Sequence, residues 1–290
     1  MIGVILAGGK GTRLFPLTTY INKHLLNVNF QPLIHYPLMD LMAAGFKDLV
    51  IITNPNDLEV FSKLLGNGKN LGIKISYISQ KSPGGLPHAI FSAKRYLLNR
   101  SFVVILGDIF FDQNNFKLFL NKSLKNFKNK GSHIFLSKVK DGRDYGIVKI
   151  KNNKIIGMIE KPLRKKLFGL DLAMNGVYIF DDKALKYITK LSPSERGELE
   201  MVDLLEIYNS NDQLTFSVLS NKDRWYDSGN MNGIIMSSNN LEKIKNSLLT
   251  PEYLAFKNGW ISKKKFKEII SSFPESYYKK HNIELLQKLF

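Results

Sequence analysis

The sequence predicts an α/β fold in which a sheet of mainly parallel strands is followed by a helical C-terminal extension. Over residues 1–110, short runs rich in Val, Ile and Leu alternate with stretches of helical character. Strands that alternate with helices of this length are typical of βαβ units, which build parallel sheets. From residue 231 onward the pattern is helical almost throughout, which predicts the extension.

In the first part of the chain, the expected strands are Gly3–Leu6, Leu49–Thr53, Ile73–Ile78 and Phe102–Leu106. The helices expected between them are Leu33–Ala44, Asp57–Leu65 and His88–Leu98. Each expected strand is a short run rich in residues with high β-propensity, as strands are. Ligands bind such sheets at the carboxyl ends of the strands, so the residues that follow Leu6 and Leu106 are the first candidates for a site.

Beyond residue 131 strands predominate. The expected strands are Ile134–Ser137, Gly146–Ile150, Ile155–Glu160, Met174–Phe180 and Gln213–Leu219, with helices at Asp182–Lys190 and Glu200–Asn209. Lys151-Asn152-Asn153-Lys154 predicts a hairpin turn. Helices are expected again over Met231–Lys245 and from Pro251 to the end. No linker divides the chain, so we expect an α/β domain over residues 1–240 with an extension over residues 241–290 packed on it.

The composition is that of a globular protein. The chain has 290 residues, 44% of them hydrophobic and 23% charged, which is enough to bury a full core. It has no cysteine, which excludes disulfides and thiolate metal sites and is compatible with the cytoplasm. The apolar run at residues 2–7 is too short to span a bilayer, and no basic segment precedes it. We therefore expect a cytoplasmic protein without a membrane segment.

The formal net charge of +17 raises the hypothesis of nucleic-acid binding. The lysines are spread along the whole chain, however, and no recognisable nucleic-acid module accompanies them. The densest run has the spacing of a solvated helix face and its exit: Lys117, Lys122, Lys125, Lys128 and Lys130. We expect no nucleic-acid partner, while the positive field would attract polyphosphate substrates.

The first candidate site is the turn that follows the first strand. Gly8-Gly9-Lys10-Gly11-Thr12-Arg13 combines three glycines with basic side chains. Glycine lets backbone N–H groups approach phosphate oxygens closely. The order Gly-Lys-Gly-Thr excludes a P-loop, and Leu14 stands where a dinucleotide fingerprint needs its third glycine. The glycines alone are compatible with either a structural turn or a phosphate-binding site. The presence of Thr12 and Arg13 favours the phosphate-binding site.

Two aspartates are candidate metal ligands. Asp108 follows the buried strand Phe102–Leu106, and Asp227 stands just before an expected helix. Mg²⁺ prefers one or two carboxylates together with phosphate oxygens and water. Each aspartate taken alone is equally compatible with a turn or an N-cap.

Three cations complete this set. Arg13 offers a planar fork suited to bidentate phosphate contact, whereas Lys23 and Lys161 would each be surface lysines if taken alone. Cations around a glycine-rich turn, together with two acids at strand ends, are typical of phosphoryl or nucleotidyl transfer. Catalysis there consists of positioning and charge neutralisation.

Two further segments are possible substrate contacts. Gln80-Lys81-Ser82-Pro83-Gly84-Gly85-Leu86 follows a strand and offers an amide suited to a base edge, although it is also compatible with a plain Pro-Gly turn. The run from Ser194 to Glu200 contacts substrate or forms a capping box at a helix start. The histidines, among them His24, have no ligand-like spacing and are interpreted as structural.

Taken in order, these motifs resemble the sugar-1-phosphate nucleotidyltransferase family, and in particular its thymidylyltransferase subgroup. The motifs that carry the resemblance are Leu6-Ala7-Gly8-Gly9-x-Gly11-Thr12-Arg13-Leu14-x-Pro16, Lys23-x-Leu25-Leu26, Gln80-x-x-Pro83-x-Gly85-Leu86, Leu106-Gly107-Asp108, Tyr145-Gly146, Glu160-Lys161-Pro162, Gly176-x-Tyr178, Arg196-Gly197-Glu198-Leu199-Glu200, Trp225-x-Asp227-x-Gly229 and Pro251-Glu252-Tyr253-Leu254-Ala255. The resemblance covers about residues 1–265. The resemblance implies a Rossmann-like three-layer mixed sheet of the nucleotide-diphospho-sugar transferase type.

The resemblance also implies a reaction, in which dTTP and glucose 1-phosphate give dTDP-glucose and pyrophosphate with Mg²⁺ as cofactor. By likeness to the family, the catalytic residues are Arg13, Lys23, Asp108 and Lys161. The nucleotide-binding residues are Leu6, Gly8, Gly9, Gly11, Thr12, Arg13, Gln80 and Gly85. The sugar-binding residues are Gly146, Glu160, Lys161 and Gly176, and the metal ligands are Asp108 and Asp227. Members of this family tend to be homotetramers, so we expect a homotetramer or another homo-oligomer.

The chain departs from the family pattern near the expected sugar and base. Ile109 stands where asparagine is usual, and His24 where glutamine is usual. The phosphate and metal groups are intact. Another hexose 1-phosphate or UTP therefore remains an alternative, as does a paralogue that binds nucleotide sugars without turnover.

Overall fold

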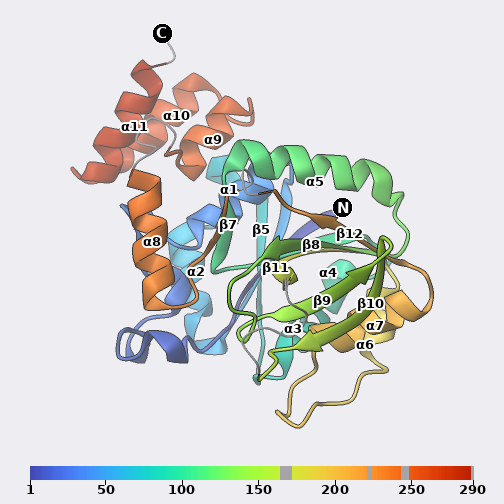
Figure 1. Cartoon of the computed structure of the whole chain (residues 1–290). Coiled ribbons are helices and arrows are strands. Elements are labelled where there is room, and N and C mark those ends of the chain that lie inside the picture. Colours follow the sequence, from blue (N-terminus) through green and yellow to red (C-terminus); the bar gives the residue numbers. More distant parts are fainter. Residues whose placement is uncertain (164–171, 221–223, 243–247, 289–290) are drawn as a thin grey trace.

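The computed structural model describes residues 1–163, 172–220, 224–242 and 248–288 (Figure 1). Within these ranges, nine strands form one sheet. They are β1 (Ile2–Ala7), β4 (Asp48–Thr53), β5 (Lys74–Ser79), β6 (Phe102–Leu106), β8 (Ser132–Lys138), β9 (Gly146–Lys151), β10 (Lys154–Glu160), β11 (Leu172–Phe180) and β12 (Leu214–Val218). The path through the sheet is β10-β9-β11-β6-β1-β4-β5, and β8 joins β11 to β12.

The first half of the chain makes the parallel part of this sheet. Strand β1 pairs in parallel with β4 and with β6, and β4 pairs in parallel with β5. The second half adds β11 antiparallel to β6, which makes the sheet mixed. The predicted α/β fold with a mixed sheet is confirmed.

Helices cover both faces of the sheet because alternate strand residues point to opposite sides. Ile5, Ile51 and Ile105 belong to one buried cluster, and their chain neighbours Val4, Val50 and Val104 belong to the other. The first cluster includes residues of α1 (His35–Ala43), α2 (Leu58–Leu65) and α5 (Gln113–Phe127). The second includes residues of α3 (Gly85–Ser92), α4 (Lys94–Leu97), α6 (Ala184–Ile188) and α7 (Met201–Ser210). The result is a three-layer arrangement.

Two local expectations have different outcomes. Asn152 and Asn153 adopt φ values of 49° and 58° between β9 and β10, so the predicted hairpin turn is confirmed. The single helix expected over His88–Leu98 is wrong, because the chain leaves helical geometry at Ala93 and forms α3 and α4. Helix α3 also begins earlier than expected, at Gly85.

The C-terminal part is helical but interrupted. It contains α8 (Met231–Glu242), α9 (Pro251–Lys257), α10 (Lys263–Ser272) and α11 (Tyr277–Gln287), and the rest of the expected helix Met231–Lys245 lies outside the described residues. The side chains of Thr250, Ser262 and Ser276 each cap a helix start by accepting a backbone N–H. Figure 1 shows the last three helices gathered at one end of the molecule.

The extension contacts the α/β body through α1. Asn258 Nδ2 donates a hydrogen bond to the carbonyl oxygen of Met42, at 3.1 Å. The division at residue 240 stays a prediction. No helix in the described ranges has both the length and the apolar character that crossing a membrane requires.

Two short strand pairs lie outside the large sheet and have no counterpart in the sequence analysis. They are β2 (Asn27–Val28) with β3 (Gln31–Pro32), and β7 (Ile109–Phe111) with β13 (Trp225–Asp227). Short 3₁₀ helices occur at Thr12–Leu14, Leu17–Thr19, Lys23–Leu25, Pro55–Asp57 and Lys69–Leu71. The β7–β13 pair joins segments more than a hundred residues apart, and it positions the site described next.

Candidate functional site

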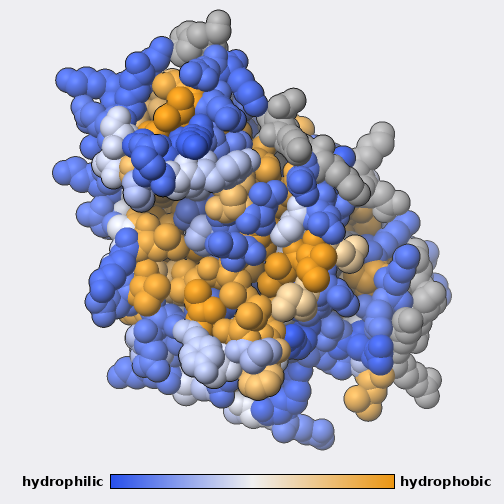
Figure 2. All heavy atoms as spheres, turned by 90° about the vertical axis from the view of Figure 1, so that its left-hand side faces the viewer, coloured by the Kyte–Doolittle hydropathy of each residue, from blue (hydrophilic) through white to orange (hydrophobic). Residues whose placement is uncertain are grey.

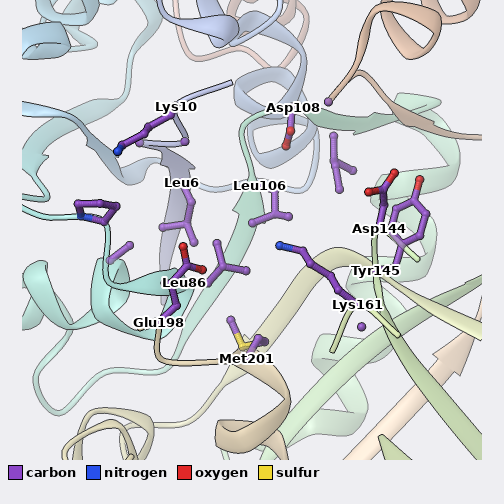
Figure 3. Close-up of a pocket in the computed structure, with 18 of the residues that line it drawn as sticks. Leu6, Lys10, Leu86, Leu106, Asp108, Asp144, Tyr145, Lys161, Glu198 and Met201 are labelled. Carbon is purple, nitrogen blue, oxygen red and sulfur yellow. The ribbon is translucent and has the colours of Figure 1, made fainter. Parts of the chain in front are cut away.

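A cleft of about 730 Å³ opens at the carboxyl ends of β1 and β6 (Figure 3). The predicted site residues that line it are Leu6, Gly8, Gly9, Gly11, Thr12, Arg13, Lys23, Gln80, Gly85, Asp108, Gly146, Glu160, Lys161 and Asp227. The cleft therefore brings together residues from both halves of the sequence. Gly176 is not among its lining residues: it lies in β11, where the space beside its Cα is filled by Ile109 and Leu106.

The glycine-rich turn needs its glycines for conformation and for space. Gly11 has a φ of 65°, and a Cβ there would lie 2.7 Å from Cγ2 of Thr18. The Thr18 hydroxyl donates to the carbonyl oxygen of Gly11 at 2.8 Å, which fixes the turn. The chain then continues into the 3₁₀ helix that carries Arg13. This geometry leaves the backbone of the turn uncovered on the side of the cleft.

The two aspartates meet through the β7–β13 pair. Asp227 is the register partner of Ile109, and the backbone N–H of Ser228 donates to the carbonyl oxygen of Asp108 at 2.9 Å. A Cβ on Gly229 would lie 3.0 Å from Asp227 Oδ1 and 3.1 Å from Asp108 Oδ2. Those two oxygens are therefore at most about 6 Å apart. Since Mg²⁺ binds oxygen at about 2.1 Å, one ion joins both carboxylates when these oxygens come within about 4 Å of each other.

The environment of Asp108 is strongly polarised. Its Oδ2 contacts the ammonium of Lys23, and both side chains are nearly buried. Burial alone would raise the pKa of Asp108, but the Lys23 ammonium outweighs it and holds the pKa at about 2. Asp108 is therefore ionised at neutral pH and paired with a cation.

Asp227 lies in a different environment. Burial, followed by repulsion from Asp108, raises the pKa of its carboxyl above the ordinary value. Its Oδ2 accepts a hydrogen bond from the Tyr145 hydroxyl at 2.6 Å, and its Oδ1 accepts one from the backbone N–H of Gly229 at 2.8 Å. A cation placed between the two acids would relieve their mutual repulsion.

The donor set suits a hard divalent ion that is completed by phosphate. The carboxylates of Asp108, just before β7, and of Asp227, in β13, line the same cleft beside the turn expected to hold a triphosphate. Within the described residues, no group of three or more His, Cys, Asp or Glu side chains is arranged to hold a metal on its own. Mg²⁺ is commonly bound in this way, by one or two carboxylates with phosphate oxygens and water.

His24 has the structural part that the sequence analysis expected, through contacts that its sequence position did not indicate. Its ring is buried, and Nδ1 lies 2.7 Å from Asn22 Oδ1, which also accepts the His24 backbone N–H. Burial, with the charge of Lys23, lowers the pKa of His24 to about 3, so the ring is neutral at neutral pH. A Cβ on Gly107 would lie 2.6 Å from the ring, so this glycine makes room for it. The packed, neutral imidazole of His24 holds the backbone of this segment in place and so positions the neighbouring Lys23.

The opposite wall of the cleft carries Lys161 and a group of acids. Figure 3 shows the Lys161 side chain extending into the cleft toward Leu106. The Arg196 guanidinium lies 2.7 Å from Glu200 and 3.8 Å from Glu160. Burial raises the pKa of Glu160, and the neighbouring Lys161 acts against this shift. This wall presents both signs of charge, as recognition of a hydroxylated, phosphorylated ligand requires.

Gln80 and Gly85 lie together at the third side of the cleft. Gln80 Nε2 is 3.3 Å from the carbonyl oxygen of Gly85 and 3.0 Å from Nδ1 of His88. Gly85 has a φ of 87°, and a Cβ there would lie 2.1 Å from the carbonyl oxygen of Leu199. No other residue fits at this position without moving the chain.

Of the two interpretations left open for the segment from Ser194 to Glu200, the capping box is wrong. Helix α7 begins at Met201, and its N-cap residue Glu200 makes no side-chain cap. The Ser194 hydroxyl instead donates to Glu200 Oε1 at 2.6 Å, and the Ser194 N–H donates to the carbonyl oxygen of Glu198. The segment is a closed loop that brings Arg196 to the cleft.

Several cleft residues were not selected as site residues from the sequence, and two of them, Asp144 and Tyr145, make polar contacts to selected ones. Asp144 and Tyr145 come directly before β9 and line the cleft beside Gly146. Tyr145 holds Asp227, and the Asp144 carboxylate pairs with Arg13 at 3.1 Å. The motif Tyr145-Gly146 pointed to this segment of the sequence. Nothing in the sequence indicated that Tyr145 would contact Asp227 or that Asp144 would pair with Arg13.

Comparisons with known proteins identify the family of this chain. Residues 2–244 match the family model described as nucleotidyl transferase. The glucose-1-phosphate thymidylyltransferase of Neisseria meningitidis is 34% identical, over 99% of this chain and all of its own length. The enzyme of the same name from Mycobacterium tuberculosis is 33% identical, over 99% of this chain and all of its own length.

A solved structure shows the same fold. A putative glucose-1-phosphate thymidylyltransferase from Bacillus anthracis, in complex with a sucrose, superposes with a TM-score of 0.75 at 33% identity. The match covers 82% of this chain and 94% of that one. With a family model that covers most of the sequence and relatives that match it from end to end, the chain belongs to the nucleotidyl transferase family.

Proposed function

We propose that the protein transfers a nucleotidyl group from a nucleoside triphosphate to a sugar 1-phosphate, and specifically that it makes dTDP-glucose and pyrophosphate from dTTP and glucose 1-phosphate. The observation that carries the proposal is the meeting of Asp108 and Asp227 beside the glycine-rich turn. The names of the relatives support the choice of dTTP and glucose.

The reaction needs no general base from the protein. A phosphate oxygen of the sugar 1-phosphate, already ionised at neutral pH, attacks the α-phosphorus in line. The bond from that phosphorus to the bridging oxygen of the β-phosphate breaks, and pyrophosphate leaves with its electron pair. The protein's contribution is therefore orientation and charge neutralisation.

Each wall of the cleft would have one task. The backbone of Gly8, Gly9 and Gly11, with Arg13 and Lys23, would bind the triphosphate. Lys161 extends into the cleft from the opposite wall, where it would hold the phosphate of the sugar and direct its attacking oxygen. These cations would also neutralise the charge that gathers on the transferred group.

The remaining predicted residues would recognise the base and the sugar. Gln80 and Gly85 would read the base edge, while Gly146 and Glu160 would contact the sugar. Gly176 would contribute indirectly: because it has no side chain, the Ile109 side chain can occupy the space beside it. Since Ile109 presents carbon to the cleft, another hexose 1-phosphate or UTP is the alternative substrate choice.

The family generally uses a divalent metal ion, and we propose Mg²⁺ for this chain. Asp108 and Asp227 would hold it, and when bound it supplies charge neutralisation at the phosphates. We also propose a cytoplasmic location, which the absence of cysteine supports.

A substrate panel tests the specific assignment. We expect the highest kcat/KM for dTTP with glucose 1-phosphate when pairs of triphosphates and sugar phosphates are compared by pyrophosphate release. If that pair were among the poorest while another pair turned over well, the choice of substrates would be wrong and the reaction class would stand. Binding of nucleotide without turnover for any pair would favour the paralogue that only binds.

Asp108→Asn tests the role of the acid pair. We expect turnover to fall by about a hundredfold or more, because a charged metal ligand and the partner of Lys23 are both lost. Asp48→Asn is the matched control, since Asp48 pairs with Arg100 on the surface. Steady-state rates as a function of Mg²⁺ concentration, with circular dichroism to confirm folding, measure the effect. A wild-type rate at saturating Mg²⁺ would contradict the assignment.

We further propose that the protein is a homo-oligomer and that α8 takes part in the interface. Figure 2 shows apolar residues gathered across the face on which α8 lies. On α8, Met231, Ile235 and Met236 are 40%, 50% and 64% exposed. Exposed apolar patches of this kind mark association surfaces.

Light scattering tests the association. We expect a solution mass that is a multiple of 33.1 kDa for the unaltered chain, and a smaller mass when Ile235→Lys and Met236→Lys are combined. A monomeric mass for the unaltered chain would contradict the proposal.

A further inference from the structure

Asp144 pairs with Arg13, one of the cations expected to bind the triphosphate. Asp144 Oδ2 lies 3.1 Å from Nη1 of Arg13. Both side chains are about half exposed, at 55% and 45%. Both residues line the cleft, and Figure 3 shows Asp144 on the wall that also carries Lys161. The pair therefore spans the cleft between the loop before β9 and the glycine-rich turn.

The other side of the Arg13 guanidinium faces the acid pair. A Cβ on Gly229 would lie 3.3 Å from Arg13 Nη2 and close to an oxygen of each metal-site carboxylate. The charge of Arg13 also acts to lower the pKa of Asp227. Arg13 thus lies between Asp144 on one side and the acid pair on the other.

The segment that carries Asp144 is held in place independently of this ion pair. The next residue, Tyr145, donates its hydroxyl to Asp227 Oδ2, and its carbonyl oxygen accepts the N–H of Lys161 at 3.0 Å. Burial and the charge of Asp227 raise the pKa of Tyr145, so its hydroxyl keeps its proton and donates. Removing the charge of Asp144 should therefore leave the segment where it is.

We propose that Asp144 sets the affinity for the nucleoside triphosphate by competing with its phosphates for Arg13. Asp144 contacts the guanidinium at Nη1 and offsets part of its positive charge, so a phosphate that binds Arg13 through two N–H groups must share or displace this contact. Asp144 also adds a negative charge to the wall that a polyphosphate must approach. The inference rests on the proposed function, because it assumes that Arg13 contacts the triphosphate.

The size of the effect follows from the exposure of the pair. Ion pairs between half-exposed side chains contribute about 0.2–1 kcal/mol, which corresponds to a factor of about 1.4 to 5 in a dissociation constant. Asp144 is thus expected to adjust affinity modestly, with the cleft and its binding residues unchanged.

Asp144→Asn, compared with Asp141→Asn, tests the inference. Asp141 lies three residues earlier and pairs with Arg143 at 2.7 Å, so its substitution changes the net charge equally and leaves the carboxylate beside Arg13 in place. Calorimetry with dTTP and Mg²⁺, and separately with inorganic tripolyphosphate and Mg²⁺, measures the dissociation constants. We expect Asp144→Asn to tighten both by a factor of about 1.4 to 5 and Asp141→Asn to leave both unchanged. Unchanged or weaker binding by Asp144→Asn, or equal tightening by both variants, would overturn the inference.

Two further measurements separate this mechanism from a general charge effect. In an Arg13→Gln background, Asp144→Asn should no longer change the affinity, because the contested group is gone. A gain that persists there would contradict competition for Arg13. In turnover assays, Asp144→Asn should lower the KM for dTTP and leave the KM for the sugar phosphate unchanged. The calorimetric measurements do not depend on turnover. If the proposed reaction were wrong, they would still show whether Asp144 competes with phosphate for Arg13.

Discussion

The backbone pairing of β7 with β13 is the constraint on which the site depends. These three-residue strands join segments that are far apart in the sequence, and their register places Asp227 opposite Ile109 and hence beside Asp108. Helix α1 packs against the β7–β13 strand pair and holds it in place. The ring of Phe110 stacks between Tyr36 and Tyr226, with centroids 4.4 and 4.9 Å away. Asp40 Oδ2 accepts the N–H of Phe111 at 3.0 Å. Burial raises the pKa of Asp40 well above its ordinary value, so this is a buried carboxyl that tends to hold its proton.

The two acids brought together in this way are not equivalent. Lys23 stabilises the charge of Asp108, whereas Asp227 has a hydroxyl and a backbone N–H as partners and is repelled by Asp108. Such opposite shifts of neighbouring groups are typical of functional sites. The arrangement favours the arrival of a cation, because only a cation relieves the repulsion between the carboxylates. The neutral, buried His24 and its Asn22 partner keep Lys23 in position without adding a charge.

The sequence predicted those parts of the fold in which local pattern and tertiary structure agree. The four strands of the parallel half are short runs rich in Val, Ile and Leu that alternate with helices, and this alternation predicted their parallel arrangement. Asn152 and Asn153 predicted their turn because asparagine accepts a positive φ. The β7–β13 pair could not be predicted, since three residues carry no periodicity and the partner lies far along the chain. The break at Ala93 and the loop from Ser194 to Glu200 depend on tertiary contacts that no local pattern encodes. The same holds for the site: motif order indicated Arg13, Asp108 and Asp227, whereas the ion pair of Asp144 depends on the folded arrangement.

The most direct measurement is a crystal structure with Mn²⁺ in place of Mg²⁺ and a nucleoside triphosphate whose α,β-bridging oxygen is replaced by a methylene group, so that it cannot be cleaved. The anomalous signal of Mn²⁺ locates the ion without reference to any assumed ligand. The account predicts a single strong peak within coordination distance of both Asp108 and Asp227 and of the triphosphate oxygens. A peak bound by only one of these aspartates, or by neither, would contradict the claim that the β7–β13 pairing builds the metal site.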